Sequence, residues 1–99
     1  MTKLLDLITP GDVLFEEFME PLGLSQNRLA RDIDVPPSRV HAIIHGTRSI
    51  TADMALRLGK YFSTSPHMWL NLQSHYDLEL AQREVWPDIE GRIRELPVG

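Results

Sequence analysis

The sequence predicts an all-α fold, a bundle of five short helices followed by a C-terminal tail. Apolar residues recur three and four positions apart, which is the spacing of a helix with one buried face. Serine, threonine and proline supply five helix-start signals along the chain. No run alternates β-branched with polar residues, and no Asn-Gly or Asp-Gly dipeptide marks a hairpin.

The first helix is predicted to begin at Pro10. Thr9 is a suitable N-cap, proline suits the first helical position, and Asp12 completes a pair of the capping-box kind. Pro21 and Gly23 are expected to end this helix. Its apolar face is formed by Val13, Leu14 and Phe18.

The second and third helices are separated by a tight turn. Ser25 caps the second helix, and Pro36-Pro37 introduces the third, where the first amide has no intrahelical acceptor to lose. Asp34 is expected to adopt a left-handed conformation in the turn, and Gly46 to end the third helix in the same way. The inward-facing residues are Leu29, Ala30, Ile33, Val35, Val40, Ile43 and Ile44.

The fourth and fifth helices have clear starts. Thr51 is an N-cap, with Asp53 near the positive end of the helix dipole. Ser65-Pro66 begins the fifth helix, which is predicted to continue to about Val85, before Pro87. The apolar faces are formed by Ala55, Leu58, Tyr61 and Phe62, and by Trp69, Leu72, Tyr76 and Leu80.

The C-terminal residues allow two interpretations. Ile89, Ile93 and Leu96 have helical spacing, so residues 88–99 either form a short sixth helix, weakened by Gly91, or fray. The predicted organisation is therefore an N-terminal arm, one helical domain and a tail, over residues 1–8, 9–85 and 86–99.

Length and composition exclude several classes of protein. A chain of 99 residues, 42% hydrophobic and 24% charged, is typical of one globular domain rather than a disordered segment. Its apolar runs are far shorter than the roughly 20 residues that a membrane span needs, and we identify no signal peptide. The absence of cysteine excludes disulfides and thiolate sites. A cytoplasmic, nucleoid-associated location is expected.

The charge distribution favours a polyanionic partner for the middle of the chain. The net charge is −4, but residues 25–60 carry six basic and three acidic side chains. Residues 1–24 carry one basic and five acidic side chains, and residues 61–99 three basic and six acidic. Such asymmetry attracts a polyanion to the centre and repels it from both ends.

The segment QNRLARDIDVPPSRVHAIIHG, residues 26–46, has the residue sizes of a helix-turn-helix. Ala30 is small where the two helices cross, Val35 fills the inside of the turn, and Val40 and Ile43 hold the next helix on the core. The segment resembles the lambda-repressor and Cro helix-turn-helix, although the glycine of that family is Asp34 here. The resemblance implies a lambda-repressor-like helix-turn-helix domain, with the motif at residues 25–46.

A wider resemblance covers about residues 9–82. The segments TPGDVLFEEF, TADMALRL and, most specifically, TSPHMWLNLQ are similar to those of the HigA antitoxin family, also called VapI. Thr9 and Asp12 replace the histidine and glutamate of the family, but both still cap a helix. The resemblance implies an antitoxin that neutralises a RelE-like, mRNA-cleaving toxin of the HigB type. It also implies a homodimeric repressor that binds the double-stranded operator of its own operon, which we expect to be an inverted repeat.

In this geometry the third helix enters the major groove with its N-terminal residues toward the bases. Arg39 is expected to contact either guanine O6 and N7 or a phosphate, and Ala42 the methyl group of thymine. Gln26 is expected to bind a phosphate at the start of the second helix. The predicted DNA-binding set is Gln26, Asn27, Pro37, Ser38, Arg39, His41, Ala42, His45, Thr47 and Arg48.

Further sites are predicted for two protein partners. Large apolar residues in excess of what a small core needs predict a dimer interface at Trp69, Trp86, Ile89 and Ile93. The toxin must bind RNA and should be basic, so it is expected to dock on an acidic surface away from the third helix, either at Glu16, Glu17 and Glu20 or on the C-terminal region. His41 and His45 have metal-ligand spacing but lack a third ligand, so no metal, cofactor or catalytic residue is predicted.

Two alternatives differ in class. A stand-alone transcriptional regulator would share the DNA-binding residues but lack a toxin partner. A small nuclease would need positioned carboxylates for a metal ion or a histidine acid–base pair, whereas the acidic side chains here are spread over helix surfaces. The sequence therefore favours a binding protein over an enzyme.

Overall fold

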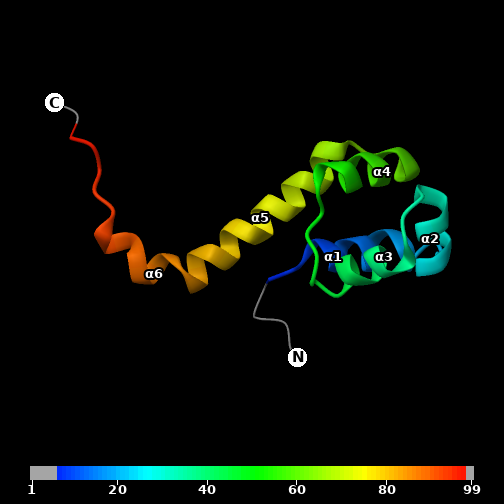
Figure 1. Ribbon diagram of the computed structural model, residues 1–99, viewed down its shortest axis with the longest axis horizontal. Helices are drawn as coiled ribbons and strands as arrows, with labels where there is room; N and C mark the ends of the chain where they lie inside the picture. Colours follow the sequence, from blue (N-terminus) through cyan, green and yellow to red (C-terminus); the bar gives the residue numbers. More distant parts are fainter. Residues whose placement is uncertain (1–6, 98–99) are drawn as a thin grey trace.

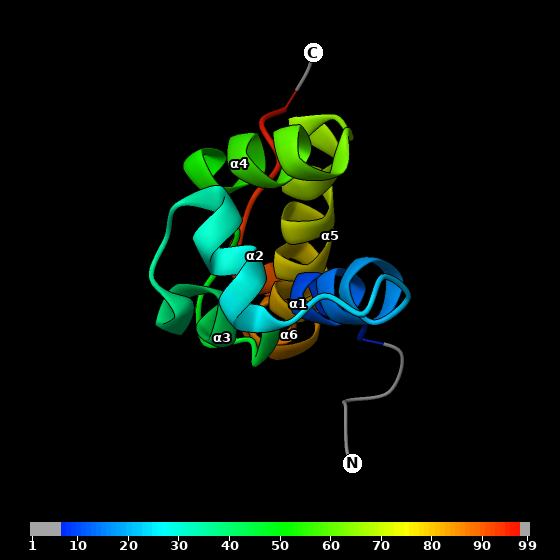
Figure 2. The ribbon, with the colours of Figure 1, turned by 90° about the vertical axis from the view of Figure 1, so that its right-hand side faces the viewer.

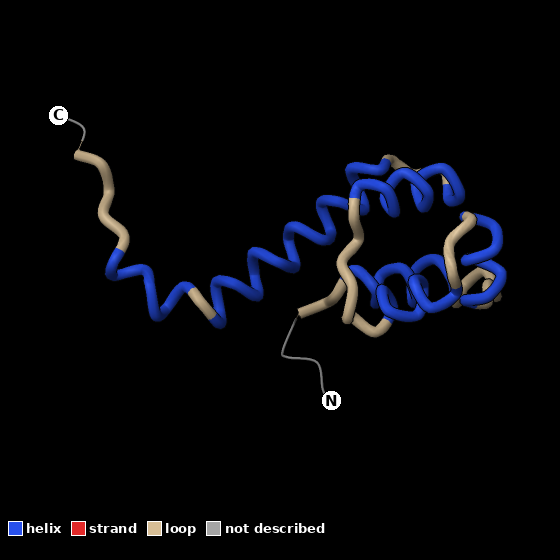
Figure 3. Tube along the Cα trace, in the orientation of Figure 1, coloured by secondary structure: helices blue, strands red, loops and turns tan. Residues whose placement is uncertain are grey.

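The computed structural model describes residues 7–97, which form helices joined by short turns (Figure 1). The elements are α1 (Pro10–Val13), η1 (Leu14–Met19), α2 (Gln26–Ile33), α3 (Pro37–Ile44), α4 (Ala52–Phe62), α5 (Pro66–Glu84), α6 (Trp86–Ile89) and η2 (Glu90–Arg92). Within residues 7–97 no strand occurs (Figure 3), and the predicted all-α fold is confirmed. Of the predicted N-terminal arm, residues 1–6 lie outside the described residues.

The predicted helix caps are present. The side chains of Thr9, Ser25, Thr51 and Ser65 each accept a hydrogen bond from a backbone amide in the first turn of the helix that follows. Thr9 forms a complete capping box, since the carboxylate of Asp12 also accepts from the Thr9 amide at 3.1 Å. Local hydrogen bonds therefore fix where α1, α2, α4 and α5 begin.

The first predicted helix contains a change of winding. It starts as α1 and continues as η1, a π-helical segment in which the amide of Glu20 bonds to the carbonyl of Phe15 at 2.8 Å. Bonds that span five residues bring Leu14 and Met19, which are five apart, onto one face. Both side chains are fully buried, so this winding turns them into the core together.

Helix α1 packs closely on the end of α3 because Gly11 has no side chain. A Cβ atom at this position would collide with the backbone carbonyls of Ile43 and Ile44. The first turn of α1 therefore sets the depth at which α3 lies on the bundle.

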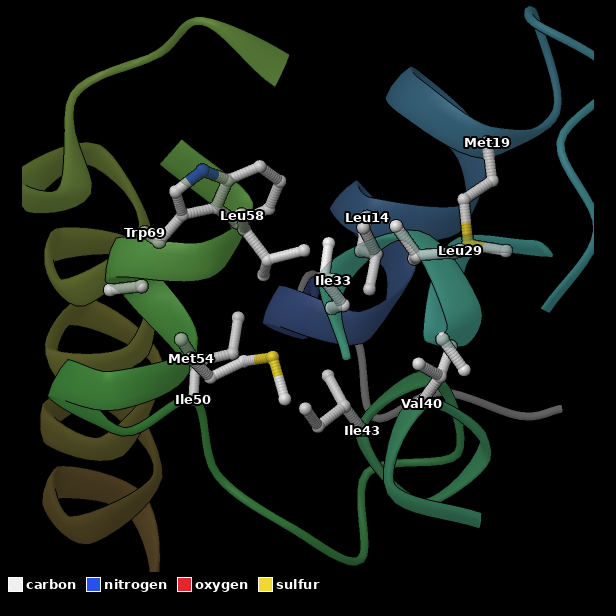
Figure 4. Close-up of a cluster of buried hydrophobic side chains, with 12 residues drawn as sticks. Leu14, Met19, Leu29, Ile33, Val40, Ile43, Ile50, Met54, Leu58 and Trp69 are labelled. Atoms are coloured by element: carbon white, nitrogen blue, oxygen red, sulfur yellow. The ribbon is translucent and has the colours of Figure 1, made fainter. Parts of the chain in front are cut away.

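The core lies among α1, η1 and the four longer helices (Figure 4). Phe18, Phe62 and Trp69 join η1, α4 and α5, with ring centroids 4.9 Å apart for Phe18–Trp69 and 5.0 Å for Phe18–Phe62. The buried cluster comprises Leu14, Met19, Leu29, Ala30, Ile33, Val40, Ile43, Ile50, Met54, Ala55, Leu58 and Trp69.

The assignment of Trp69 to a dimer interface is wrong. Its side chain is 0% exposed, and its indole N–H donates to the hydroxyl of Thr64 at 2.8 Å. A side chain enclosed by its own chain has no surface left for a partner.

The second half of α5 and all of α6 extend away from the bundle (Figure 1). The Cα radius of gyration is 16.6 Å, against about 13 Å for a compact chain of this length. No side chain from Ser74 to Pro97 is buried, although Leu7, Ile8 and Val13 line a pocket together with His75 and Glu79 at the start of this segment. The tail contains the short sixth helix α6, but helical structure stops at Arg92 and the backbone is extended at Ile93, so Ile89, Ile93 and Leu96 do not share one helical face.

Within residues 7–97, no helix combines the length and the apolar character needed to cross a bilayer.

Candidate nucleic-acid interface

The turn between α2 and α3 has the predicted geometry. Asp34 is left-handed, with φ 62° and ψ 51°, and the amide of Val35 bonds to the carbonyl of Ala30 at 3.0 Å. Aspartate tolerates this region better than most residues, so it can stand in for glycine. Ala30 is fully buried, as expected where α3 crosses α2.

Arg57 of α4 holds this turn from behind. Its Nη1 donates to the carbonyl oxygens of Ile33 at 2.7 Å and Asp34 at 3.0 Å, and its Nε donates to Asp53 at 3.0 Å. These carbonyls end α2 without an intrahelical partner, and the guanidinium supplies one. The sequence shows the i, i+4 pair with Asp53 but gives no signal for the contact with the turn.

Replacing Arg57 with methionine should destabilise the fold. The charge-assisted bonds to two carbonyls are lost, and because the side chain is 35% exposed we expect a loss of about 1–2 kcal/mol in the free energy of unfolding. Urea unfolding of Arg57→Met beside Lys60→Met, an exposed cation on the same helix, measures this effect. Equal stabilities of the two variants would show that Arg57 does not support the turn.

A second contact joins α2 to α4. The hydroxyl of Tyr61 donates to the carboxylate of Asp32 at 2.7 Å. This bond, with lesser contributions from Arg28 and Arg31, holds the pKa of Asp32 below its ordinary value of 3.8. The same bond raises the pKa of Tyr61 above 10.0. Two polar contacts with α4 thus hold α2 in position.

Helix α3 lies beside α2 at the edge of the bundle (Figure 2). The α3 residues Val40 and Ile43 are buried, at 1% and 2% exposure, so the opposite face of the helix points outward. Among the residues predicted to contact DNA, those on α3 and its C-cap are either exposed or half-buried. Pro37, Ser38, His41 and His45 are exposed, and Arg39 and Ala42 are half-buried.

Gln26 and His41 connect the starts of the two helices. Nδ1 of His41 lies 3.3 Å from Oε1 of Gln26, and because a carboxamide oxygen only accepts, the imidazole donates. The amide NH₂ group of Gln26 is left for another acceptor. His41 also contacts His45, with ring centroids 4.1 Å apart.

The loop after α3 is fixed at both ends. Gly46 is left-handed, with φ 78°, and both donors of Thr47 bond to the carbonyl of Ala42, the amide at 2.9 Å and the hydroxyl at 3.2 Å. At the other end, the amide of Ile50 donates to Oε1 of Gln73 at 2.7 Å. Arg48 is exposed between these two points, so it is the cation that this loop presents.

Thr47, which is predicted to contact the DNA backbone, has both of its hydrogen-bond donors engaged within the loop. It can therefore donate to a phosphate only by turning its hydroxyl away from Ala42. Sequence reasoning also missed Gln73, because a bond across 23 positions leaves no local signal.

In the described part of the chain, no three histidine, aspartate or glutamate side chains gather into a group that could hold a metal ion. Helix α2, α3 and the following loop together form a surface on which polar and basic side chains are exposed. It presents Arg39, Arg48, the exposed imidazoles and the free amide group of Gln26.

The Helix-turn-helix family matches residues 15–69 of this chain. The chain is 47% identical over 77 residues to Virulence-associated protein I of Dichelobacter nodosus, covering 78% of this chain and 71% of that protein. It is also 47% identical to an uncharacterized HTH-type transcriptional regulator, YbaQ of Escherichia coli, covering 86% and 76%. Among solved structures, antitoxin HigA of Pseudomonas aeruginosa with the higBA promoter matches at 42% identity and a TM-score of 0.87, covering 91% and 98%.

Proposed function

This chain belongs to the HigA family of helix-turn-helix antitoxins, and on that premise we propose that it is a homodimeric autorepressor and antitoxin. It binds an inverted repeat in the operator of its own operon and neutralises a RelE-like toxin of the HigB type. Its partners are double-stranded DNA, a second copy of itself and the toxin. It acts by binding, without a catalytic residue or cofactor, in the cytoplasm and at the nucleoid.

The outward face of α3 is the observation that carries this proposal. Val40 and Ile43 fix the helix to the core, and the residues between them and before them face away from it. The residues proposed to contact base edges are Pro37, Ser38, Arg39, His41 and Ala42. Those proposed to contact the DNA backbone are Gln26, Asn27, His45, Thr47 and Arg48.

The proposed dimer interface is the segment that leaves the bundle. An apolar groove of about 430 Å³ lies there, lined by Leu78, Ala81, Gln82, Val85, Trp86 and Ile89. Val85, Trp86 and Ile93 are 51%, 39% and 60% exposed, which is a large apolar surface for one chain to leave in water. A second copy that covers it would place two α3 helices on successive half-sites of DNA.

The test of operator binding uses DNA from upstream of the gene that encodes this chain. We expect specific binding whose affinity falls steeply with salt, because phosphate contacts release counterions. Fluorescence anisotropy against a scrambled duplex measures both properties. Equal affinity for the two duplexes would contradict the proposal.

The proposed toxin-docking surface is the acidic face of η1. Glu16, Glu17 and Glu20 are exposed there beside Phe15 and Leu22, which are 37% and 69% exposed. A toxin that binds RNA should be basic, and this surface offers it both negative charge and apolar contact. It belongs to a different element from α3, and we propose that toxin and operator bind at the same time.

Reversing the charge of Glu16 and Glu20 to lysine should slow association with the toxin. The effect should grow at low salt and leave operator affinity unchanged or slightly improved, because charge steers the encounter of two proteins. Stopped-flow association and DNA binding with the same variant measure the two effects. If Ser38→Ala with Arg39→Ala abolishes toxin binding while the reversals are silent, both partners use the α3 face.

A stand-alone transcriptional regulator is the second candidate, favoured by the similarity to YbaQ, which is named only as a regulator. The two candidates differ in protein partner. Co-purification of this chain with the product of the adjacent gene supports the antitoxin. A chain that binds its operator but does not bind that product supports the regulator.

A further inference from the structure

One buried polar side chain connects the loop after α3 to helix α5. Within the described residues, Gln73 is the polar side chain that is buried, at 9% exposure. Its Oε1 accepts the amide of Ile50 at 2.7 Å, and its Nε2 donates to Oδ1 of Asp77 at 3.0 Å. Both ends of the carboxamide are therefore bonded, which fixes its orientation.

The bond to Ile50 matters because that amide lies inside the core. Ile50 is 3% exposed, so no solvent replaces the acceptor if Gln73 is removed, and a buried donor without an acceptor is costly. The loop that Ile50 ends is joined to α5 through this bond to Gln73. Without the acceptor, the loop must shift until the amide finds another partner.

The same loop carries Arg48. Thr47 is fixed to Ala42 on one side of it, and Ile50 to Gln73 two residues beyond it. Arg48 itself is exposed, so its backbone position is set by these two anchors. Loss of one anchor would shift the backbone at Arg48 and so change the position from which its guanidinium extends.

We propose that Gln73 is a positioning residue for DNA binding, which holds Arg48 where it meets a backbone phosphate. The inference rests on the proposed operator binding. Gln73 does not touch DNA and acts through the amide of Ile50.

The location of Gln73 on α5 gives this contact a second consequence. Asp77, the other partner of Gln73, is followed directly by Leu78, the first residue of the proposed dimer groove. One rigid helix therefore holds both the phosphate-binding loop and the dimer interface. In the dimer, α5 fixes the distance between the two copies of Arg48.

The test compares Gln73→Met with Arg48→Ala in the full-length chain on its operator DNA. Methionine matches glutamine in length but offers no comparable acceptor, so we expect a loss in affinity of about tenfold or more. The slope of log affinity against log salt should become shallower by about two, one phosphate contact per protomer. The double variant should be no weaker than the more affected single variant, since both remove the same contact.

Two further variants keep the test decisive if Gln73→Met folds poorly. The double variant Gln73→Glu with Asp77→Asn exchanges the carboxamide and the carboxylate. The glutamate at position 73 accepts from the Ile50 amide, and the asparagine at position 77 donates to the glutamate. This double variant should recover operator affinity, salt slope and slow hydrogen exchange of the Ile50 amide. Asp77→Asn alone keeps the bond to Ile50 and should bind operator as the wild type does.

Three results would contradict the positioning role. One is an unchanged salt slope in Gln73→Met despite fast exchange at Ile50, and another is additive losses with Arg48→Ala. The third is a Gln73→Glu, Asp77→Asn double variant that recovers slow hydrogen exchange at the Ile50 amide but does not recover operator affinity. If the wild-type chain itself shows no preference for operator DNA, operator binding fails, and the exchange of the Ile50 amide is still measured separately.

Discussion

Replacing Arg39 with alanine should reduce operator affinity by about 2–6 kcal/mol in the dimer, since each bidentate arginine–guanine contact contributes about 1–3 kcal/mol. The loss should be confined to the cognate operator, and base preference should relax at one position in each half-site. Arg39 is half-buried on α3, so its side chain is already partly ordered before it meets a base.

Arg48→Ala is the matched control for this substitution. It removes the same charge from the loop instead of the helix and should weaken all duplexes alike. Affinities for the operator and for its single-base variants, measured with both proteins, separate the two roles. An Arg39→Ala protein with unchanged affinity and unchanged base preference would exclude α3 as the element that reads the sequence.

Replacing Val85 with aspartate should convert the dimer to a monomer. Val85 lies in the apolar groove at the junction of α5 and α6, and a carboxylate buried against a second copy would lack a partner. The bundle should stay folded, because no side chain beyond Gln73 belongs to its core. Operator affinity should fall by about a hundredfold or more, because each monomer then binds a half-site on its own instead of as part of a dimer.

Sedimentation, circular dichroism and operator titration of Val85→Asp measure these three effects. Leu56→Asp is the control, since Leu56 is an exposed apolar residue of α4, at 61% against 51% for Val85, and lies outside the groove. A Val85→Asp protein that remains dimeric would show that the two copies meet elsewhere.

The features that the sequence predicted correctly depend on local interactions. Thr9, Ser25, Thr51 and Ser65 each cap a helix through an amide two or three residues away, so short motifs suffice to place these starts. The left-handed Asp34 follows from the same kind of reasoning, since the conformation depends on that residue and its turn.

The features that escaped prediction depend on contacts between distant positions. Arg57 reaches Ile33 across 24 positions, and Gln73 reaches Ile50 across 23, so neither bond leaves a periodic signal. The π winding of η1 also depends on distant contacts, because it brings Leu14 and Met19 into a core that other helices complete.

Trp69 shows why an apolar stripe does not separate core from interface. Trp69 and Trp86 lie on successive helices and look alike in sequence, yet the first is fully buried and the second 39% exposed. The difference depends on where the buried part of α5 ends, which is at Gln73. This end point is set by the packing of η1 and α4 against α5 rather than by the residues of α5.

Hydroxyl-radical footprinting of the DNA upstream of this chain's gene tests the central claim most directly. A dimer that inserts two α3 helices into successive major grooves should protect two patches on one face of the duplex. We expect their centres to be about 34 Å apart, one helical turn, or a multiple of it. A single protected patch, or no protection at concentrations that saturate binding, would contradict the account.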